Sequence, residues 1–147
     1  MTTFVNDPVT IIGVELRTTN ADSAATIPPF WDEVSGSGIL ASIPGRLSED
    51  TYALYSNFEN AGQDNNGFYS LIIGAAVKSD TPVPDGMTLA VIPASVREVF
   101  SVRDNDRHNV VEAWQEVWAR TDLAKTYLCE YELYAANGEI TVNIGVR

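Results

Sequence analysis

Two segments of the chain share a tyrosine-rich core, and only one of them carries a charge. Tyr52-Ala53-Leu54-Tyr55 and Tyr131-Glu132-Leu133-Tyr134 differ at a single position, where alanine is replaced by glutamate. Both segments are rich in the aromatic residues that strands favour. A carboxylate held against apolar surface is costly unless another group pairs with it. Glu132 is therefore a candidate anionic centre of a binding site, and the alternative is a charge on a solvated strand face.

The residues around Glu132 indicate what such a site would bind. Strand alternation puts Glu130 and Tyr134 on the same face as Glu132, so Tyr134 is a predicted neighbour, whereas we interpret Glu130 as a surface charge. In a partly dehydrated space with aromatic walls, a carboxylate and cation–π contacts hold an organic cation far more strongly than in water. The predicted walls are Tyr55, Phe58 and Tyr69, together with Trp114 or Trp118, of which at least one packs in the core.

The same residues allow a catalytic interpretation. A buried glutamate with a raised pKa could activate water as a general base, with Glu132 in that role and Tyr134 stabilising the developing charge. Because the sequence contains no nucleophile motif and no second compelling acid, we favour binding over hydrolysis. We assign no chemical role to the remaining reactive side chains. Tyr52, Tyr131 and Cys129 are expected to be structural, and His108 is expected to be a solvated loop residue.

The composition limits the classes of partner. The 147-residue chain has 45% hydrophobic and 20% charged residues, which predicts one globular domain. Nine basic residues against twenty acidic ones give a net charge of −11, which disfavours binding to nucleic acid or to anionic lipid. A single cysteine and a single histidine argue against a Cys/His metal site, and we expect no cofactor. The chain shows no bilayer-spanning apolar run and no signal peptide, so we expect a cytoplasmic protein.

Hydrophobic patterns and turn residues predict a mixture of strands and helices. The first helix is expected to start with Thr26 as its cap and two prolines in its first turn, and to be short because glycines follow. The second helix is expected to use Asn109 as its cap, with Glu112 three residues on. We interpret 60–67 as a plain turn, since the ligand spacing of a calcium loop is missing. The expected strands are 10–19, 52–58, 68–78, 87–92, 96–103, 125–135 and 140–146, and the expected helices are 26–34 and 108–120.

The two halves of the chain carry similar pieces in the same order. These are Trp-x-Glu-Val at 31–34 and 114–117, Tyr-x-Leu-Tyr at 52–55 and 131–134, and Ile-Gly at 73–74 and 144–145. This order suggests a βαββ unit used twice, at about 10–78 and 96–146, within one domain that spans 1–147. The predicted fold is α+β, with two pseudo-symmetric βαββ (SH2-like) units flanking a central ligand cleft.

An ordered set of short motifs extends over nearly the whole chain. The set consists of Tyr52-Ala53-Leu54-Tyr55, Gly67-x-Tyr69 with Ile73-Gly74, Pro84-x-Gly86, Ile92-Pro93-Ala94, the stretch from Val111 to Trp118, and Tyr131-Glu132-Leu133-Tyr134. In these motifs the sequence resembles the effector-binding domain shared by AraC-type and MerR-type multidrug-responsive regulators and by stand-alone gyrase-inhibitory proteins. It is most similar to the stand-alone members carried on integron gene cassettes. The resemblance implies a central cleft for amphiphilic, often cationic compounds, with the glutamate matching Glu132 lying among aromatic side chains.

Several functions follow from this resemblance. We expect no attached helix-turn-helix domain, so a transcriptional response would need a DNA-binding regulator in trans, whereas sequestration of a toxic compound would not. Some members of the resembling family are reported as hydrolases of small electrophilic compounds, and the gyrase-inhibitory relatives suggest a protein-interaction module that contacts a basic partner. We favour a stand-alone module that binds cationic or amphiphilic drug-like small molecules, with Glu132 as the counter-charge.

Overall fold

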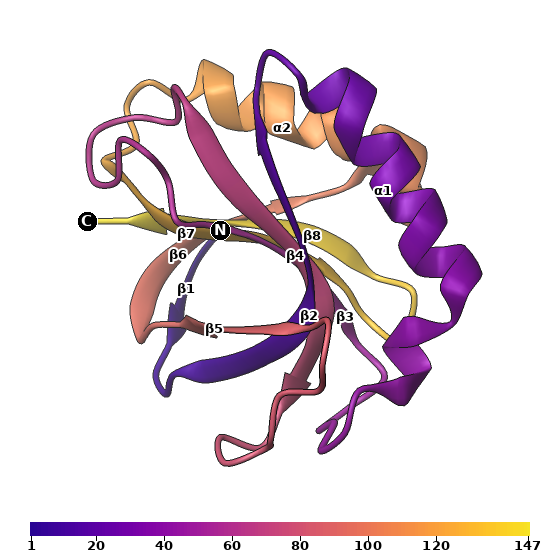
Figure 1. Ribbon diagram of the computed structural model, residues 1–147. Coiled ribbons are helices and arrows are strands. Elements are labelled where there is room, and N and C mark those ends of the chain that lie inside the picture. The colour runs from indigo at the N-terminus through magenta and orange to yellow at the C-terminus, as the bar shows by residue number, and fades with distance from the viewer.

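A computed structural model of the protein describes residues 1–147 (Figure 1). The strands are β1 (Thr2–Val5), β2 (Val9–Thr19), β3 (Thr51–Ser56), β4 (Phe68–Val77), β5 (Thr88–Ile92), β6 (Ser95–Ser101), β7 (Lys125–Tyr134) and β8 (Ile140–Val146). The helices are α1 (Ser23–Ser37) and α2 (Val110–Ala119), with short 3-10 segments at Ile39–Ser42, Arg103–Asn105 and Arg107–Asn109. None of the helices has the length and apolar character needed to cross a membrane.

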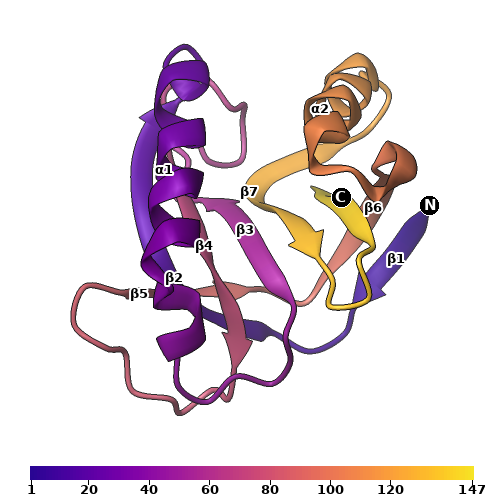
Figure 2. The ribbon, with the colours of Figure 1, turned by 90° about the vertical axis from the view of Figure 1, so that its right-hand side faces the viewer.

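All eight strands form one curled antiparallel sheet (Figures 1 and 2). The strand order is β1-β6-β8-β7-β3-β4-β2-β5. Outward from the central β3–β7 pair, β4 and β2 follow on one side, and β8 and β6 follow in the equivalent order on the other. The fold is therefore α+β with two βαββ units joined through β3 and β7, as the sequence predicts. An internal repeat over 10–78 and 96–146 stays a prediction.

The chain passes from one unit to the other at the two edge strands, β1 and β5. β1 precedes β2 in the chain but pairs with β6, and β5 pairs with β2 although the next strand, β6, belongs to the other unit. Pro93 lies between β5 and β6, where the chain passes to the second unit, and it cannot donate to a strand ladder because it has no N–H. The sequence does not predict β1, because a four-residue strand with alternately exposed side chains is defined by the partner it pairs with.

The helices lie on the outer face of the sheet, one over each unit (Figure 2). Each helix buries its apolar stripe against the strands of its own unit. Under α2 the core contains Val110, Ala113, Val117, Val142 and Ile144, and under α1 it contains Val34, Ala53, Leu71 and Ile73. The inner face of the sheet has a separate core that includes Ile11, Leu54 and Ile72. The space between the two helices is thus left to the side chains of β3 and β7.

Helix α1 is longer than the sequence predicts. It begins three residues before and ends three residues after the predicted range 26–34. Thr26 is therefore inside the helix, and its hydroxyl donates to a backbone carbonyl one turn earlier instead of capping the start. Pro28 and Pro29 also lie inside the helix, where their missing N–H groups remove two helical hydrogen bonds. Gly38 ends the helix with a φ of 70°, a conformation that glycine adopts without strain.

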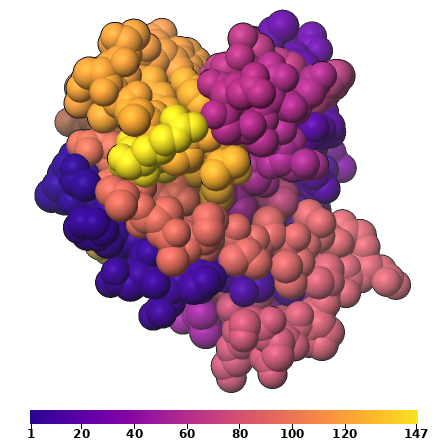
Figure 3. Space-filling view, turned by 90° about the vertical axis from the view of Figure 1, so that its left-hand side faces the viewer, coloured from indigo at the N-terminus to yellow at the C-terminus, as the bar shows by residue number.

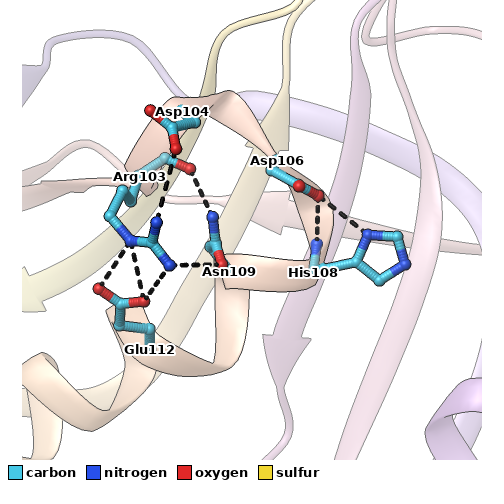
Figure 4. Close-up of polar contacts among 6 residues, drawn as sticks. All are labelled: Arg103, Asp104, Asp106, His108, Asn109 and Glu112. Atoms are coloured by element: carbon cyan, nitrogen blue, oxygen red, sulfur yellow. Dashed lines mark hydrogen bonds and ion pairs between the residues drawn. The ribbon is translucent and has the colours of Figure 1, made fainter.

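The start of α2 is held by a polar cluster rather than by the predicted capping pair (Figure 4). The side-chain oxygen of Asn109 accepts a 3.0 Å hydrogen bond from Arg103, and its amide donates to the Arg103 carbonyl. Glu112 pairs with the same guanidinium at 3.1 Å. Asp106 instead accepts from the backbone N–H of His108 at 2.9 Å and caps the 3-10 turn before the helix. Asn109 is the N-cap residue of α2, as predicted, but it makes no side-chain capping hydrogen bond, because charge-assisted bonds to Arg103 compete for the same side chains.

The C-terminus fastens the loop after β3 to the start of β7 (Figure 3). The Arg147 guanidinium donates to the carbonyl of Gly62 at 2.9 Å and to that of Lys125 at 3.1 Å. The backbone N–H of Gly62 donates to the Tyr127 carbonyl at 3.3 Å. In Figure 3 the yellow C-terminal residues accordingly lie between the orange segment leading into β7 and the magenta loop 57–67. These bonds hold the loop next to the first residues of β7.

Candidate functional site

A cavity of about 770 Å³ is lined by residues of α1, α2, β3 and β7, on the helix-covered side of the sheet. Figure 2 shows these central strands between the two helices. The volume lies in the range of pockets that enclose drug-sized ligands. All the residues predicted for the cleft contribute to this wall, namely Glu132, Tyr134, Trp114, Trp118, Tyr55, Phe58 and Tyr69. Their part in ligand binding stays a prediction.

Glu132 is buried in the cavity wall, with 3% of its surface exposed, on β7 opposite Ala53 of β3. Its Oε2 accepts a hydrogen bond from the Trp114 indole N–H at 2.7 Å and another from the Tyr55 hydroxyl at 2.9 Å. Its Oε1 accepts from the Tyr134 hydroxyl at 2.5 Å. Because the three donors come from α2, β3 and β7, the tertiary fold assembles the partners of this carboxylate. Glu132 is therefore not a charge on a solvated strand face.

Two opposing effects act on the charge of Glu132. Burial raises the pKa of Glu132, because the charged form loses hydration, and the hydrogen bonds from Tyr134, Trp114 and Tyr55 counter part of this effect. Burial and the nearby carboxylate raise the pKa of Tyr69 to about 12 and hold the pKa values of Tyr55 and Tyr134 well above the ordinary tyrosine value. The hydroxyl groups thus remain protonated donors, and a cation entering the cavity would favour the charged form of Glu132.

Aromatic rings extend the wall away from Glu132 in a continuous series of contacts. The centroids of Tyr55 and Trp114 are 5.3 Å apart in an edge-to-face arrangement, and those of Trp114 and Trp118 are 6.3 Å apart. On the other side, Tyr55 and Tyr69 are 5.7 Å apart, and Tyr69 and Phe58 are 5.9 Å apart. Both tryptophans of α2 therefore reach the cavity, Trp114 next to the carboxylate and Trp118 with 51% of its surface exposed. Such rings can offer π faces to a cation.

Glu130 also lines the cavity, so its predicted role as a surface charge is wrong. Only 5% of its surface is exposed, and it lies opposite Tyr55 in the β3–β7 pair. Burial raises the pKa of Glu130 to about 7, although the charges of Lys125 and Arg97 act in the opposite direction. Alternation correctly puts it on the face of Glu132. What the sequence does not show is that other parts of the chain cover this face.

Helix α1 contributes an aromatic residue that the sequence does not assign to the cleft. Trp31 lines the cavity and meets the Tyr134 ring edge-on at a centroid distance of 5.2 Å. A signal for this residue was present, because Trp31 occupies the position in the first half that corresponds to Trp114 in the second. With both helices lying over the central strands, corresponding positions face the same space from opposite sides.

The residues with structural interpretations lie apart from the anionic centre. Tyr52 and Tyr131 pack together at 5.7 Å against the inner core, and Cys129 is buried there. His108 is exposed at the rim of the cavity, where its imidazole is 2.9 Å from the Asp106 carboxylate. No group of three or more histidine, cysteine, aspartate or glutamate side chains is arranged to hold a metal ion.

Comparison with known proteins places these features in a family. Residues 5–144 match Cass2, described as an integron-associated effector binding protein. A Bacillus subtilis (strain 168) protein named "Putative transcriptional regulator protein YobU" is 29% identical over 134 residues, which cover 87% of this chain and 82% of that protein.

Solved structures share the fold over the whole chain. An integron cassette protein from Vibrio cholerae has a TM-score of 0.72 at 21% identity, with 100% of this chain and 95% of that chain covered. The structure of SAV2435 bound to tetraphenylphosphonium has a TM-score of 0.80 at 15% identity, with 100% and 93% covered. The family match and the shared fold agree with the motifs read from the sequence, and the chain belongs to the Cass2 family of integron-associated effector binding proteins.

Proposed function

We propose that this effector-binding protein takes bulky aromatic cations into the cavity, with Glu132 as their counter-charge. The observation that carries the proposal is a carboxylate with 3% of its surface exposed, held by three hydrogen-bond donors and surrounded by aromatic rings. No lysine, arginine or histidine of the chain forms an ion pair with it. A buried carboxylate without a cationic partner is costly, so a cationic ligand would supply the charge that the protein leaves out.

The chemistry of the wall favours one kind of cation. A small, strongly hydrated cation would lose much of its hydration on entering, and the donors on Glu132 already satisfy much of the carboxylate's hydrogen-bonding capacity. A delocalised organic cation loses less hydration, because its charge is spread over apolar surface. Its rings gain about 25 cal/mol per Å² of apolar surface buried, and its charge interacts with both Glu132 and the aromatic faces.

The comparisons support the same ligand class. A structural neighbour, SAV2435, is bound to tetraphenylphosphonium, which is a bulky aromatic cation. The name of the Bacillus subtilis relative refers to transcriptional regulation. We therefore extend the proposal to a regulatory response through a separate DNA-binding protein, since a net charge of −11 makes direct DNA binding by this chain unfavourable. Sequestration of the compound would use the same site without a partner.

A hydrolase that uses Glu132 as a general base has less support. Its raised pKa suits a base, but both of its oxygens already accept hydrogen bonds from protein donors. A base that abstracts a proton from water needs an acceptor site directed at that water. The donors around Glu132 instead stabilise a fixed negative charge, as an electrostatic binding site requires.

Calorimetric titration of the protein with tetraphenylphosphonium and with neutral triphenylphosphine oxide tests the proposal. We expect saturable binding of the cation and at least about tenfold weaker binding of the neutral compound, because only the cation interacts with the buried charge. The preference should persist at high salt, since buried pairs are screened much less than surface pairs. Equal binding of both compounds, or no saturable binding, would refute the proposal. Recovery of a chemically altered ligand by mass spectrometry would favour the hydrolase instead.

A further inference from the structure

We propose that Glu130 forms a second anionic subsite in the cavity and accepts hydrogen bonds from an N–H-bearing cationic group of the ligand, such as an ammonium or amidinium. The proposal rests on the function proposed above and narrows its ligand class. The preferred compounds would be aromatic dications, with one delocalised charge near Glu132 and one hydrogen-bonding charge at Glu130.

The hydrogen bonding of Glu130 differs from that of Glu132. Glu132 has three protein donors, whereas no side chain or backbone N–H donates to the Glu130 carboxylate. Glu130 is nevertheless 95% buried, since only 5% of its surface is exposed. No fully enclosed side-chain polar atom in the protein lacks a partner, so the free Glu130 oxygens keep accessible surface, and Glu130 lines the cavity. A buried acceptor that reaches a cavity without a protein donor is a position for a ligand donor.

The position of Glu130 joins the main cavity to a second hollow of about 490 Å³. Lys125 and Tyr127 line this second hollow, and Glu130 and Trp118 belong to both spaces. An irregularity in the sheet lies at this point. From Lys125 to Glu130, β7 advances five residues while β8 advances two, from Val146 to Ile144. Such bulges redirect side chains and are common beside ligand sites.

The nearest cations of the protein do not neutralise Glu130. Lys125 forms no ion pair with it. Arg97 lies on the inner side of the sheet, where its guanidinium donates to the Cys129 carbonyl and to Ser95 and stacks over the Tyr131 ring. Both charges act on Glu130 only at longer range. Its carboxylate is therefore available to a group that enters the cavity.

The spacing of Glu130 and Glu132 along β7 indicates the length of ligand that we expect. Residues two apart on one strand face the same side, with their Cα atoms about 6.6–6.8 Å apart. This is close to the separation between a charge on one side of a phenyl ring and an amine on a short arm at the other side. The two sites also prefer different groups, because three protein donors already occupy most acceptor positions of Glu132, whereas Glu130 has free lone pairs for directional N–H bonds.

Matched triphenylphosphonium probes isolate the second subsite. They differ only in the para substituent of a fourth phenyl ring, which is methyl, aminomethyl or trimethylammoniomethyl. The methyl probe has one charge, the aminomethyl probe adds a charged N–H donor, and the trimethylammoniomethyl probe adds a charge without any N–H. Each is titrated calorimetrically at neutral pH into the unmodified protein, Glu130→Gln and the control Glu116→Gln, which removes an exposed charge from α2.

We expect the aminomethyl probe to bind the unmodified protein and Glu116→Gln at least about tenfold more tightly than the methyl probe, as a charge-assisted hydrogen bond allows. In Glu130→Gln this advantage should fall to less than about threefold, with the affinity for the methyl probe nearly unchanged. The trimethylammoniomethyl probe should gain less than the aminomethyl probe. If the methyl probe binds but the aminomethyl arm adds no affinity, or if the advantage persists in Glu130→Gln, the second subsite is refuted and the proposed function stands. If no probe binds, the proposed function itself fails.

Proton release gives a second measurement on the unmodified protein, independent of how the variant folds. Titration in buffers of different ionisation enthalpy counts the protons released, and the aminomethyl probe should release more than the methyl probe because it requires ionised Glu130. The other titratable or charged groups around Glu130 are Lys125, Tyr127, Cys129, Arg97, Glu132 and, opposite it on β3, Tyr55. Glu132 affects both probes alike, so equal proton release by the two probes would contradict the proposal.

Discussion

Replacing Glu132 with glutamine removes one negative charge from the cavity while keeping the shape of the side chain. The glutamine oxygen can still accept from Trp114 and Tyr55, the two donors that now share Oε2. Its amide nitrogen then faces the Tyr134 hydroxyl, which can rotate to accept instead of donate. We therefore expect the variant to fold, and the change in binding to report the charge itself.

The size of the effect follows from Coulomb's law. A ligand charge about 5 Å from the carboxylate gains roughly 3 kcal/mol at an effective dielectric constant of about 20 and roughly 1 kcal/mol in water, because the energy is about 332/(εr) kcal/mol. The buried position of Glu132 favours the upper part of this range. Burial, which raises the pKa of Glu132 by disfavouring its charged form, acts in the opposite direction. We expect a loss of about 1–3 kcal/mol, which is roughly a 5- to 150-fold increase in Kd.

Tryptophan fluorescence is a suitable assay because the chain has three tryptophans and all of them line the cavity, namely Trp31, Trp114 and Trp118. The whole tryptophan signal therefore comes from the site. Tetraphenylphosphonium and neutral triphenylphosphine oxide are titrated into the unmodified protein, Glu132→Gln and Glu116→Gln. The last variant is the control, since Glu116 is exposed on α2 and lines neither hollow.

Three results would refute this reasoning. If Glu132→Gln binds the cation within about twofold of the unmodified protein, Glu132 is not the counter-charge. If the variant loses affinity for the neutral compound as much as for the cation, the loss comes from a damaged cavity wall rather than from the missing charge. Equal losses in Glu116→Gln and Glu132→Gln would show that only the overall negative charge of the protein matters.

Three further predictions concern stability. The raised pKa of Glu130, about 7 in the folded state against about 4.5 unfolded, contributes stability that is present below pH 4.5 and lost as the pH rises through 7. In urea unfolding, the free energy of unfolding of the protein should thus fall by roughly 3 kcal/mol relative to Glu130→Gln as the pH rises across this window. Parallel pH profiles for the two proteins would contradict the raised pKa of Glu130. Trp114→Phe removes one donor from Glu132 and should cost about 1–3 kcal/mol in chemical denaturation, whereas an unchanged midpoint would mean that water replaces the donor. Gly13→Ala puts a Cβ 2.2 Å from a carbonyl oxygen of β4 and should destabilise the folded protein by about 1–3 kcal/mol. Gly36→Ala, whose added Cβ has nothing within 4 Å, should not destabilise it. Similar unfolding curves for the two variants would be inconsistent with a tight β2–β4 approach.

Local patterns in the sequence determine much of this protein. The strands follow from runs of β-branched and aromatic residues, and the apolar stripe of α2 follows from helical spacing, because both depend on the neighbours of each residue along the chain. The matching pieces of the two halves predict the two βαββ units. The single difference between the two Tyr-x-Leu-Tyr segments singles out Glu132, because a carboxylate is the one side chain there that is costly to bury.

Only the tertiary structure decides how these faces are covered. Glu130 and Glu132 share one face of β7, and the sequence does not distinguish them. The fold brings Tyr55 and Trp114 to Glu132 from other elements, but it brings no donor to Glu130, although both are buried. The capping of α2 likewise depends on Arg103, which binds the predicted capping residues. Burial and hydrogen bonding are set by residues distant in the sequence, so the short-range pattern predicts the strand and its polar face, and long-range packing determines the chemistry of each carboxylate on it.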